Sequence, residues 1–199
     1  MLVGGAQVAK GQRSIPAAGT ALVLIDVIND LKFPGAETLI ADAEPMALRL
    51  ARLRRRAVRS GVPVIYVNDN FGQWRSDFRQ TVAHCTSSSS PGAVVSRRLK
   101  PSRNDYFVLK PKHSGFYGTT LDSLLTDLHI RRLVLTGIAG NICVLFTAND
   151  AYMRGLQVFA PSDCIVSNSE AVNTAALEQM AWVLKADTRP SALLAFKKA

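Results

Sequence analysis

The stretch ALVLIDVIND (residues 21–30) runs from five consecutive apolar residues into a polar segment. Short, continuous apolar runs rich in β-branched residues are typical of strands that are buried on both faces of a sheet. Counting this one, such runs are present at residues 21–25, 62–67, 133–136 and 157–160. We therefore expect four buried strands, the first of which ends directly before Asp26.

Longer helical patterns separate these predicted strands. Apolar residues recur at helical spacing over residues 41–60, 119–128, about 144–154 and 169–184. Strands that alternate with helices predict βαβ units and a mostly parallel sheet, with helices on both faces because the crossovers are right-handed. The expected fold is a three-layer α/β/α domain of Rossmann-like topology.

Length and composition indicate one globular domain. The chain has 199 residues, of which 48% are hydrophobic and 20% charged, so disorder along the whole chain is excluded. We expect residues 15–199 to form the domain and residues 1–14 to be a flexible segment without a secretory signal. No apolar run approaches the ~20 residues that span a bilayer. The three cysteines are too few and too scattered for a disulfide framework, which favours a cytoplasmic location.

The formal net charge is +9, and much of the positive charge lies in one arginine-rich stretch. Its arginines are Arg49, Arg52, Arg54, Arg55, Arg56 and Arg59. One interpretation is a surface for nucleic acid or another anionic partner. The other is the solvated face of a helix whose buried stripe is formed by Leu50, Leu53, Ala57 and Val58. We favour the second and expect no nucleic-acid partner, because no stacking aromatic residues lie between the arginines.

Functional residues of such sheets collect at the carboxyl ends of the strands. Asp26 directly follows the first predicted strand, in the segment DVIND (residues 26–30). A partly desolvated carboxylate at this place is suited to act as a base or to orient one. The alternative is that Asp26 caps the turn or the next helix.

The third predicted strand runs into GIAGNIC (residues 137–143), a turn of small residues that leads into a helix. This places Cys143 near a helix N-terminus, where the dipole and free amides favour a thiolate, so we expect its pKa to lie well below ~8.5. The same amides are suited to hold an oxyanion. The alternative is a buried, inert cysteine. Cys85 and Cys164 lack this setting and are interpreted as structural.

Lys110 closes the apolar run FVLK (residues 107–110), ahead of the third predicted strand. An ammonium group beside a thiol would favour the thiolate. A surface lysine is the alternative, and it is the better description of Lys112, which lies outside the apolar run.

Together these segments resemble the isochorismatase-like family, also called the cysteine hydrolases, over about residues 20–185. The family's D-x-x-N-D motif after the first strand matches Asp26, Asn29 and Asp30. Its K-x-x-x-S-x-F motif matches Lys110, Ser114 and Phe116. Its G-I-A-x-x-x-C-V motif matches Gly137, Ile138, Ala139, Cys143 and Val144, and the pattern that follows matches Thr147, Asp150, Ala151 and Gly155.

The resemblance implies that Asp26, Lys110 and Cys143 are catalytic. Asp26 would take the thiol proton of Cys143, Lys110 would balance the charge, and Cys143 would attack a carbonyl carbon to give a thioester that water releases. The backbone amides of Ala139 and Cys143 would form the oxyanion hole, next to a cis peptide bond between Ile138 and Ala139. Because siderophore-pathway isochorismatases lack the cysteine, its presence points to hydrolysis of a small amide or a related C–N bond.

The resemblance also bears on metals and cofactors. Relatives that hydrolyse nicotinamide bind a metal through an Asp and several His residues after the second strand. Here residues 67–74 contain Asp69 but no His, and one carboxylate does not build a transition-metal site. We therefore expect no metal and no other cofactor. Gly140 stands where many relatives have Thr, and we expect this difference to alter the turn or the pocket.

Candidates for substrate binding follow the strands or flank the motifs, and they are Asn29, Phe33, Phe71, Trp74 and Tyr117. The aromatic residues suit an apolar pocket for a small planar substrate, with ordinary core packing as the alternative. A homo-oligomer, either a dimer or a tetramer, is expected from the resemblance. Two alternative functions stay open, namely isochorismatase-type hydrolysis of a non-amide substrate and a non-catalytic binding protein that keeps the fold.

Overall fold

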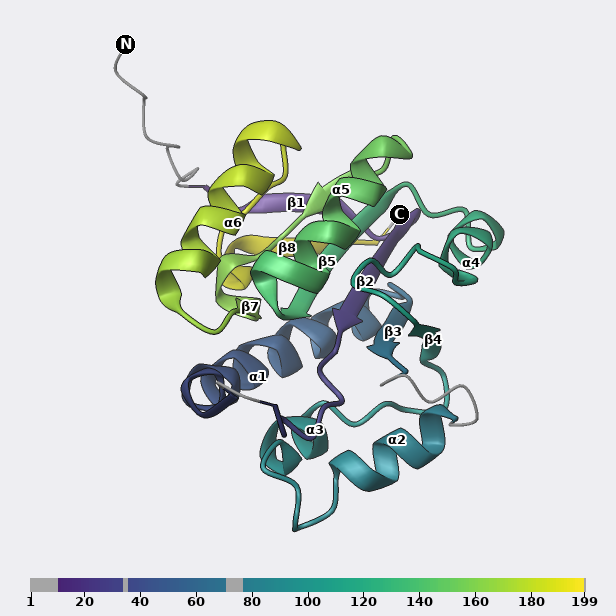
Figure 1. The fold of residues 1–199 in the computed structure, drawn as a ribbon. Helices are drawn as coiled ribbons and strands as arrows, with labels where there is room; N and C mark the ends of the chain where they lie inside the picture. The colour runs from purple at the N-terminus through teal and green to yellow at the C-terminus, as the bar shows by residue number, and fades with distance from the viewer. Residues whose placement is uncertain (1–10, 34–35, 71–76, 199) are drawn as a thin grey trace.

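A parallel sheet of six strands forms the centre of the computed structural model, which describes residues 11–33, 36–70 and 77–198 (Figure 1). The strands are β2 (Thr20–Ile25), β3 (Val64–Asp69), β4 (Tyr106–Lys110), β5 (Arg132–Ile138), β6 (Gln157–Phe159) and β7 (Ile165–Val166). Five of them lie in the order β4-β3-β2-β5-β6, and β7 pairs with β5. Each of these pairings is parallel, which confirms the predicted fold class.

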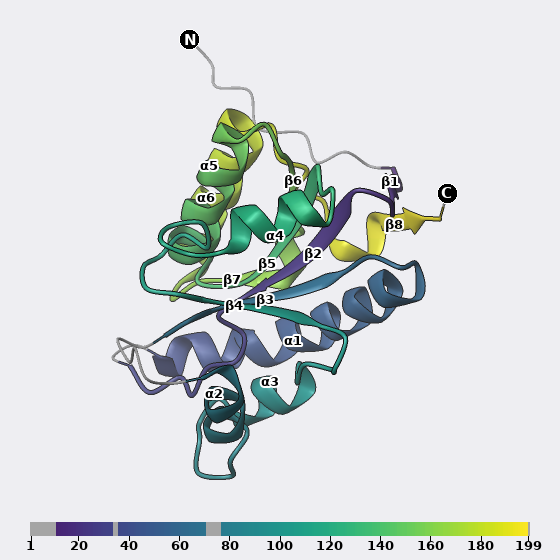
Figure 2. The same cartoon turned by 90° about the vertical axis from the view of Figure 1, so that its right-hand side faces the viewer.

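Helices cover both faces of the sheet, so the predicted three layers are confirmed (Figure 2). One face carries α1 (Ala36–Arg59), α2 (Phe78–Cys85) and α3 (Ala93–Arg98). The other carries α4 (Leu121–Asp127), α5 (Leu145–Met153) and α6 (Glu170–Val183). No helix within the described ranges is long and apolar enough to cross a membrane.

The central strand β2 shows why its sequence is continuously apolar. All six of its residues are buried. Leu22 and Leu24 pack into the core on the α1 side, whereas Ala21, Val23 and Ile25 pack into the core on the opposite side. A strand between two helical layers has no solvent face, and therefore no polar alternation.

Several elements differ from the sequence-based expectation. The patterns do not predict β4, where Tyr106 and Phe107 are exposed, nor β7, which has only two residues. Nor do they predict the small parallel pair of β1 (Arg13–Pro16) and β8 (Leu194–Lys197). The expected boundary after residue 14 falls inside β1. Residues 86–96, expected to be a loop, end in the first turn of α3.

The arginine-rich stretch forms the second half of α1. Leu50, Leu53 and Ala57 are fully buried, as predicted, but Val58 is 52% exposed and lies outside the buried stripe. The helix begins at Ala36, five residues before the expected start, and continues through Pro45. Proline removes one helical hydrogen bond at a cost of about 3 kcal/mol, which the burial of a long apolar stripe offsets.

Candidate active site

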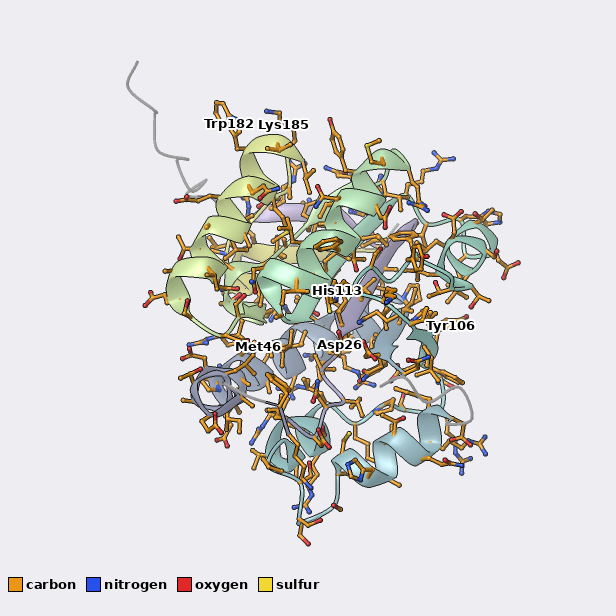
Figure 3. All side chains as sticks on the ribbon, viewed as in Figure 1. Asp26, Met46, Tyr106, His113, Trp182 and Lys185 are labelled. Atoms are coloured by element: carbon orange, nitrogen blue, oxygen red, sulfur yellow. The ribbon has the colours of Figure 1, made fainter. Side chains whose placement is uncertain are left out.

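Three strands bring the predicted residues Asp26, Lys110 and Cys143 together at their carboxyl ends. Asp26 directly follows β2, and Lys110 is the last residue of β4. Cys143 lies in η1 (Gly140–Val144), a π-helical turn that begins two residues after β5 and leads into α5. Figure 3 labels Asp26 near the middle of the molecule.

The ammonium group of Lys110 is the centre of the cluster. Its Nζ lies 2.9 Å from Oδ2 of Asp26 and 3.4 Å from Sγ of Cys143. A third acceptor, Oδ2 of Asp69 at the end of β3, also lies 3.4 Å away. A lysine has three N–H donors, so each of them has a partner here. Because the Lys110 side chain is fully buried, this pairing is what makes a charged lysine tolerable in the core.

Burial and charge act in opposite directions on the two ionic partners. Burial raises the pKa of the Asp26 carboxyl above its usual 3.8, and the Lys110 ammonium only partly offsets this effect. Burial by itself would lower the pKa of Lys110, but the negative charge of Asp26 in particular raises it above the usual 10.5. Asp26 is thus a stronger base than an exposed carboxylate, and Lys110 stays charged.

The thiol of Cys143 is protonated at neutral pH, contrary to the expected low pKa. Burial and the nearby Asp26 carboxylate raise its pKa to about 12, more than Lys110 lowers it. The sequence-based expectation was wrong because it counted the helix terminus and the lysine but not the desolvation and the carboxylate. Cys143 and Asp26 are also in hydrogen-bonding contact, so a proton acceptor adjoins the thiol.

The backbone around the cluster requires particular residues. Gly137 has φ +114°, and a Cβ there would lie 2.0 Å from the carbonyl oxygen of Ile25. The peptide bond between Ile138 and Ala139 is cis, as predicted. Asp26 has φ 50°, which costs a non-glycine residue about 1–3 kcal/mol. Two bonds hold it there, since its N–H donates to the Val67 carbonyl and its Oδ1 accepts from the Asp69 N–H at 2.6 Å.

Thr147 connects the segment that follows Lys110 with the turn that carries Cys143. Its buried hydroxyl accepts a hydrogen bond from the Gly115 N–H at 3.0 Å and donates one to the Cys143 carbonyl at 2.7 Å. Beside it, the Ser114 hydroxyl donates to Asp150 Oδ2 at 2.5 Å. These bonds link residues that the family motifs mark, and they fix the lysine segment against the start of α5.

Two residues that the sequence patterns did not single out support the η1 turn from below. The Ser167 hydroxyl accepts from the Asn141 N–H at 3.1 Å and donates to Asn173 Oδ1 at 3.0 Å. A Cβ on Gly140 would lie 2.3 Å from that Asn173 oxygen, so the glycine is what lets α6 approach the turn. Ser167 follows β7, a strand too short to recognise, and this hid its position.

Three of the five predicted substrate-binding residues, Asn29, Phe33 and Tyr117, are among the residues that the structure describes. Phe33 is 36% and Tyr117 63% exposed, which excludes core packing for both. Asn29 uses its side-chain oxygen locally, to accept from the Leu31 N–H at 2.8 Å. Phe71 and Trp74 lie outside the described residues. Substrate binding by these residues therefore stays a prediction.

The two remaining cysteines are buried and free, as the structural interpretation requires. In the part of the chain that the structure describes, no group of three or more His, Cys, Asp or Glu residues is arranged to hold a metal ion. The carboxylate of Asp69, the acidic residue that follows the second predicted strand, contacts the Lys110 ammonium.

The fold and this cluster together define a class of α/β hydrolases with an aspartate, a lysine and a cysteine at one end of a parallel sheet. The chain matches the isochorismatase domain over residues 20–188, so it belongs to the isochorismatase family.

Several of the proteins to which the chain is similar are amidohydrolases. The chain is 44% identical over 170 residues to YaaI, an uncharacterized isochorismatase family protein of Bacillus subtilis. The aligned residues cover 85% of this chain and 93% of YaaI. It is 29% identical to the ureidoacrylate amidohydrolase RutB of Methylobacterium radiotolerans over 71% of this chain, and spans 64% of RutB. The solved N-carbamoylsarcosine amidase of Thermoplasma acidophilum superposes with a TM-score of 0.66 at 28% identity, over 86% of this chain and 96% of the amidase.

Proposed function

We propose that this protein is a cysteine amidohydrolase that cleaves a C–N bond of a small amide or ureido compound. One observation carries the proposal. The Lys110 ammonium contacts both Sγ of Cys143 and the carboxylate of Asp26, so nucleophile, base and countercharge meet around one nitrogen atom. The amidohydrolase activity of the relatives favours the same reaction class.

The first half of the reaction forms a thioester. As Sγ of Cys143 attacks the carbonyl carbon, the thiol proton moves to Asp26, whose raised pKa suits it to accept a proton. The attack turns the carbonyl oxygen into an oxyanion. When the C–N bond breaks, the proton on Asp26 passes to the departing nitrogen, and an amine or ammonia leaves. Lys110 keeps its charge throughout and offsets the negative charge of the cluster.

The second half releases the acid. Water gives a proton to Asp26 and attacks the thioester carbon, and the C–S bond breaks as the proton returns to sulfur. Both halves use the oxyanion hole that we assign to the backbone N–H groups of Ala139 and Cys143. In the same turn the N–H groups of Ile142 and Val144 donate to the Ala139 carbonyl, and that of Asn141 donates to Ser167.

Turnover of a panel of primary amides, ureides and carbamoyl compounds tests the proposal. We expect at least one compound to be hydrolysed, and the Cys143→Ala protein to lose at least about a thousandfold in kcat/KM with its thermal unfolding unchanged. Hydrolysis that persists in Cys143→Ala would refute the cysteine mechanism.

Three other functions predict different results. A non-catalytic binding protein would bind amides without releasing product, and a hydrolase of a non-amide substrate would leave the whole panel intact. A nucleic-acid-binding protein would bind DNA or RNA with a steep salt dependence, and absence of binding at low salt excludes it. We propose none of these. The two binding functions do not explain a buried lysine between a carboxylate and a thiol, and the amidohydrolase relatives favour an amide over a non-amide substrate.

We also propose a homo-oligomer in the cytoplasm. Large apolar side chains are exposed on α5 and α6, among them Phe146, Met153, Val172 and Trp182. Figure 3 shows Trp182 at the end of α6 remote from Asp26, so contacts there would leave the site open. Light scattering after size-exclusion chromatography measures the oligomer, and a monomer at micromolar concentration would contradict it. The cytoplasm suits three free cysteines.

A further inference from the structure

Asp69 is the charged side chain at the cluster that the proposed reaction does not use. It ends β3 and is paired in register with Lys110 of β4. Its Oδ2 lies 3.4 Å from Nζ of Lys110, the same distance as Sγ of Cys143. Its backbone N–H meanwhile donates to Oδ1 of Asp26. Asp69 therefore contacts two of the three proposed catalytic residues.

The charges around the thiol decide which form of the cysteine is stable. Within the described residues, the negatively charged groups that contact Lys110 or Cys143 are Asp26, directly after β2, and Asp69, at the end of β3. With a thiol on Cys143, one ammonium faces two carboxylates. With a thiolate, the same ammonium would face three negative groups in a largely buried site, where repulsion is weakly screened.

We propose that Asp69 competes with Cys143 for the ammonium of Lys110 and thereby adds to the burial and the Asp26 carboxylate that keep Cys143 a neutral thiol in the resting protein. The inference rests on the proposed role of Cys143 as the nucleophile, and it makes Asp69 a positioning residue that acts through Lys110. The thiolate then forms only as sulfur attacks a substrate and its proton moves to Asp26. Because oxidants and alkylating agents react with thiolates, a resting thiol is also protected from them.

The rate at which iodoacetamide alkylates Cys143 tests this inference without a substrate. Mass spectrometry of the peptide that contains residue 143 measures the rate at neutral pH. Asp69→Asn removes one negative charge and keeps the shape, so alkylation should become about tenfold faster, which corresponds to a fall of about one unit in the thiol pKa. Asp122→Asn makes the same charge change at an exposed position of α4 and should leave the rate unchanged. If Asp69→Asn does not fold, Asp69→Ser takes its place.

A second background separates electrostatics from mere access to the sulfur. If Asp69 acts through the ammonium, Asp69→Asn should accelerate alkylation much less when Lys110 is absent. We expect the factor of acceleration in a Lys110→Gln protein to be at least threefold smaller than in the protein that keeps Lys110. No acceleration by Asp69→Asn, or an equal acceleration in both backgrounds, would overturn the inference. If Asp69→Asn accelerates alkylation but the protein hydrolyses no amide, the role of Asp69 is supported and the proposed function is refuted. If the protein hydrolyses an amide but Asp69→Asn does not accelerate alkylation, the proposed function is supported and the role of Asp69 is refuted.

Discussion

Cys143 and Cys164 lie in similar places but in different surroundings. Both follow strands of the same sheet, Cys143 in η1 after β5 and Cys164 in η2 (Ser162–Cys164) after β6. Burial raises the pKa of both thiols, and a neighbouring carboxylate, Asp26 or Asp163, raises it further. Neither cysteine is therefore set apart by an easily ionised thiol.

What separates them is access and the presence of an ammonium group. Cys143 is partly exposed, whereas Cys164 is completely buried. Lys110 contacts both sulfur and base at Cys143. At Cys164 the carboxylate of Asp163 is bound instead by the backbone N–H and the hydroxyl of Ser191. The proposed nucleophile is thus distinguished from the structural cysteine by a base with a countercharge and an open approach, and not by a lowered resting pKa.

The largest expected effect comes from removing the base at Cys143. Asp26→Asn keeps the size of the side chain but cannot accept the thiol proton, so kcat/KM should fall about 10²–10⁴-fold. Steady-state kinetics on the best compound of the amide panel measures it. Asp163→Asn, the matched change beside Cys164, should keep kcat/KM, and equal losses in the two variants would erase the distinction between the two regions.

The pH dependence of kcat/KM reports on the Asp26 carboxylate, the proposed base. Because burial raises the pKa of Asp26 above 3.8, kcat/KM should fall as the pH decreases through a midpoint above that value. Lys110 lowers this pKa, so Lys110→Gln should move the midpoint to still higher pH in addition to slowing the reaction. A midpoint at or below 3.8, or a shift to lower pH in Lys110→Gln, is the contrary result.

A smaller effect is expected from the hydroxyl that connects the two catalytic segments. Thr147→Val keeps the shape but leaves the Gly115 N–H without its acceptor, which costs about 1–3 kcal/mol of unfolding free energy. The turn at Cys143 should also loosen, lowering kcat more than it changes KM. Chemical denaturation and kinetics measure both, and Thr147→Ser should restore them. Failure of the serine variant to restore kcat would show that the methyl group, not the hydroxyl, matters.

The smallest effect on activity is expected at the other cysteine. Cys164→Ala removes a fully buried sulfur and should cost about 1 kcal/mol of unfolding free energy. Its kcat/KM should stay within about twofold of the unchanged protein, since no catalytic step uses this sulfur. If Cys164→Ala lost more activity than its lower stability explains, Cys164 would take part in catalysis.

The sequence predicted the central strands and the layered fold because buried parallel strands are recorded directly as continuous apolar runs. It failed where burial is incomplete or the element is short. β4 has two exposed residues at its start, β7 has two residues in all, and β1 and β8 form only with each other. None of these leaves a local apolar pattern of sufficient length.

The candidate site was predictable from the motif residues, but its electrostatics was not. The motifs identified Asp26, Lys110 and Cys143, whereas the state of the thiol depends on burial and on distances between strands far apart in the chain. The sequence motifs indicate Asp69 only as a possible metal ligand, although its register opposite Lys110 makes it an ionic partner. Pairing register within a sheet is fixed by the fold and is not visible along the sequence.

Trapping the acyl-enzyme tests whether Cys143 is the nucleophile. The protein is mixed with the best substrate of the amide panel, quenched in acid during turnover, digested and analysed by mass spectrometry. We expect the acyl group of the substrate on Cys143, removable by hydroxylamine as a thioester is, and none on Cys85 or Cys164. Full turnover by Cys143→Ala, or an acyl group on another residue, would contradict it.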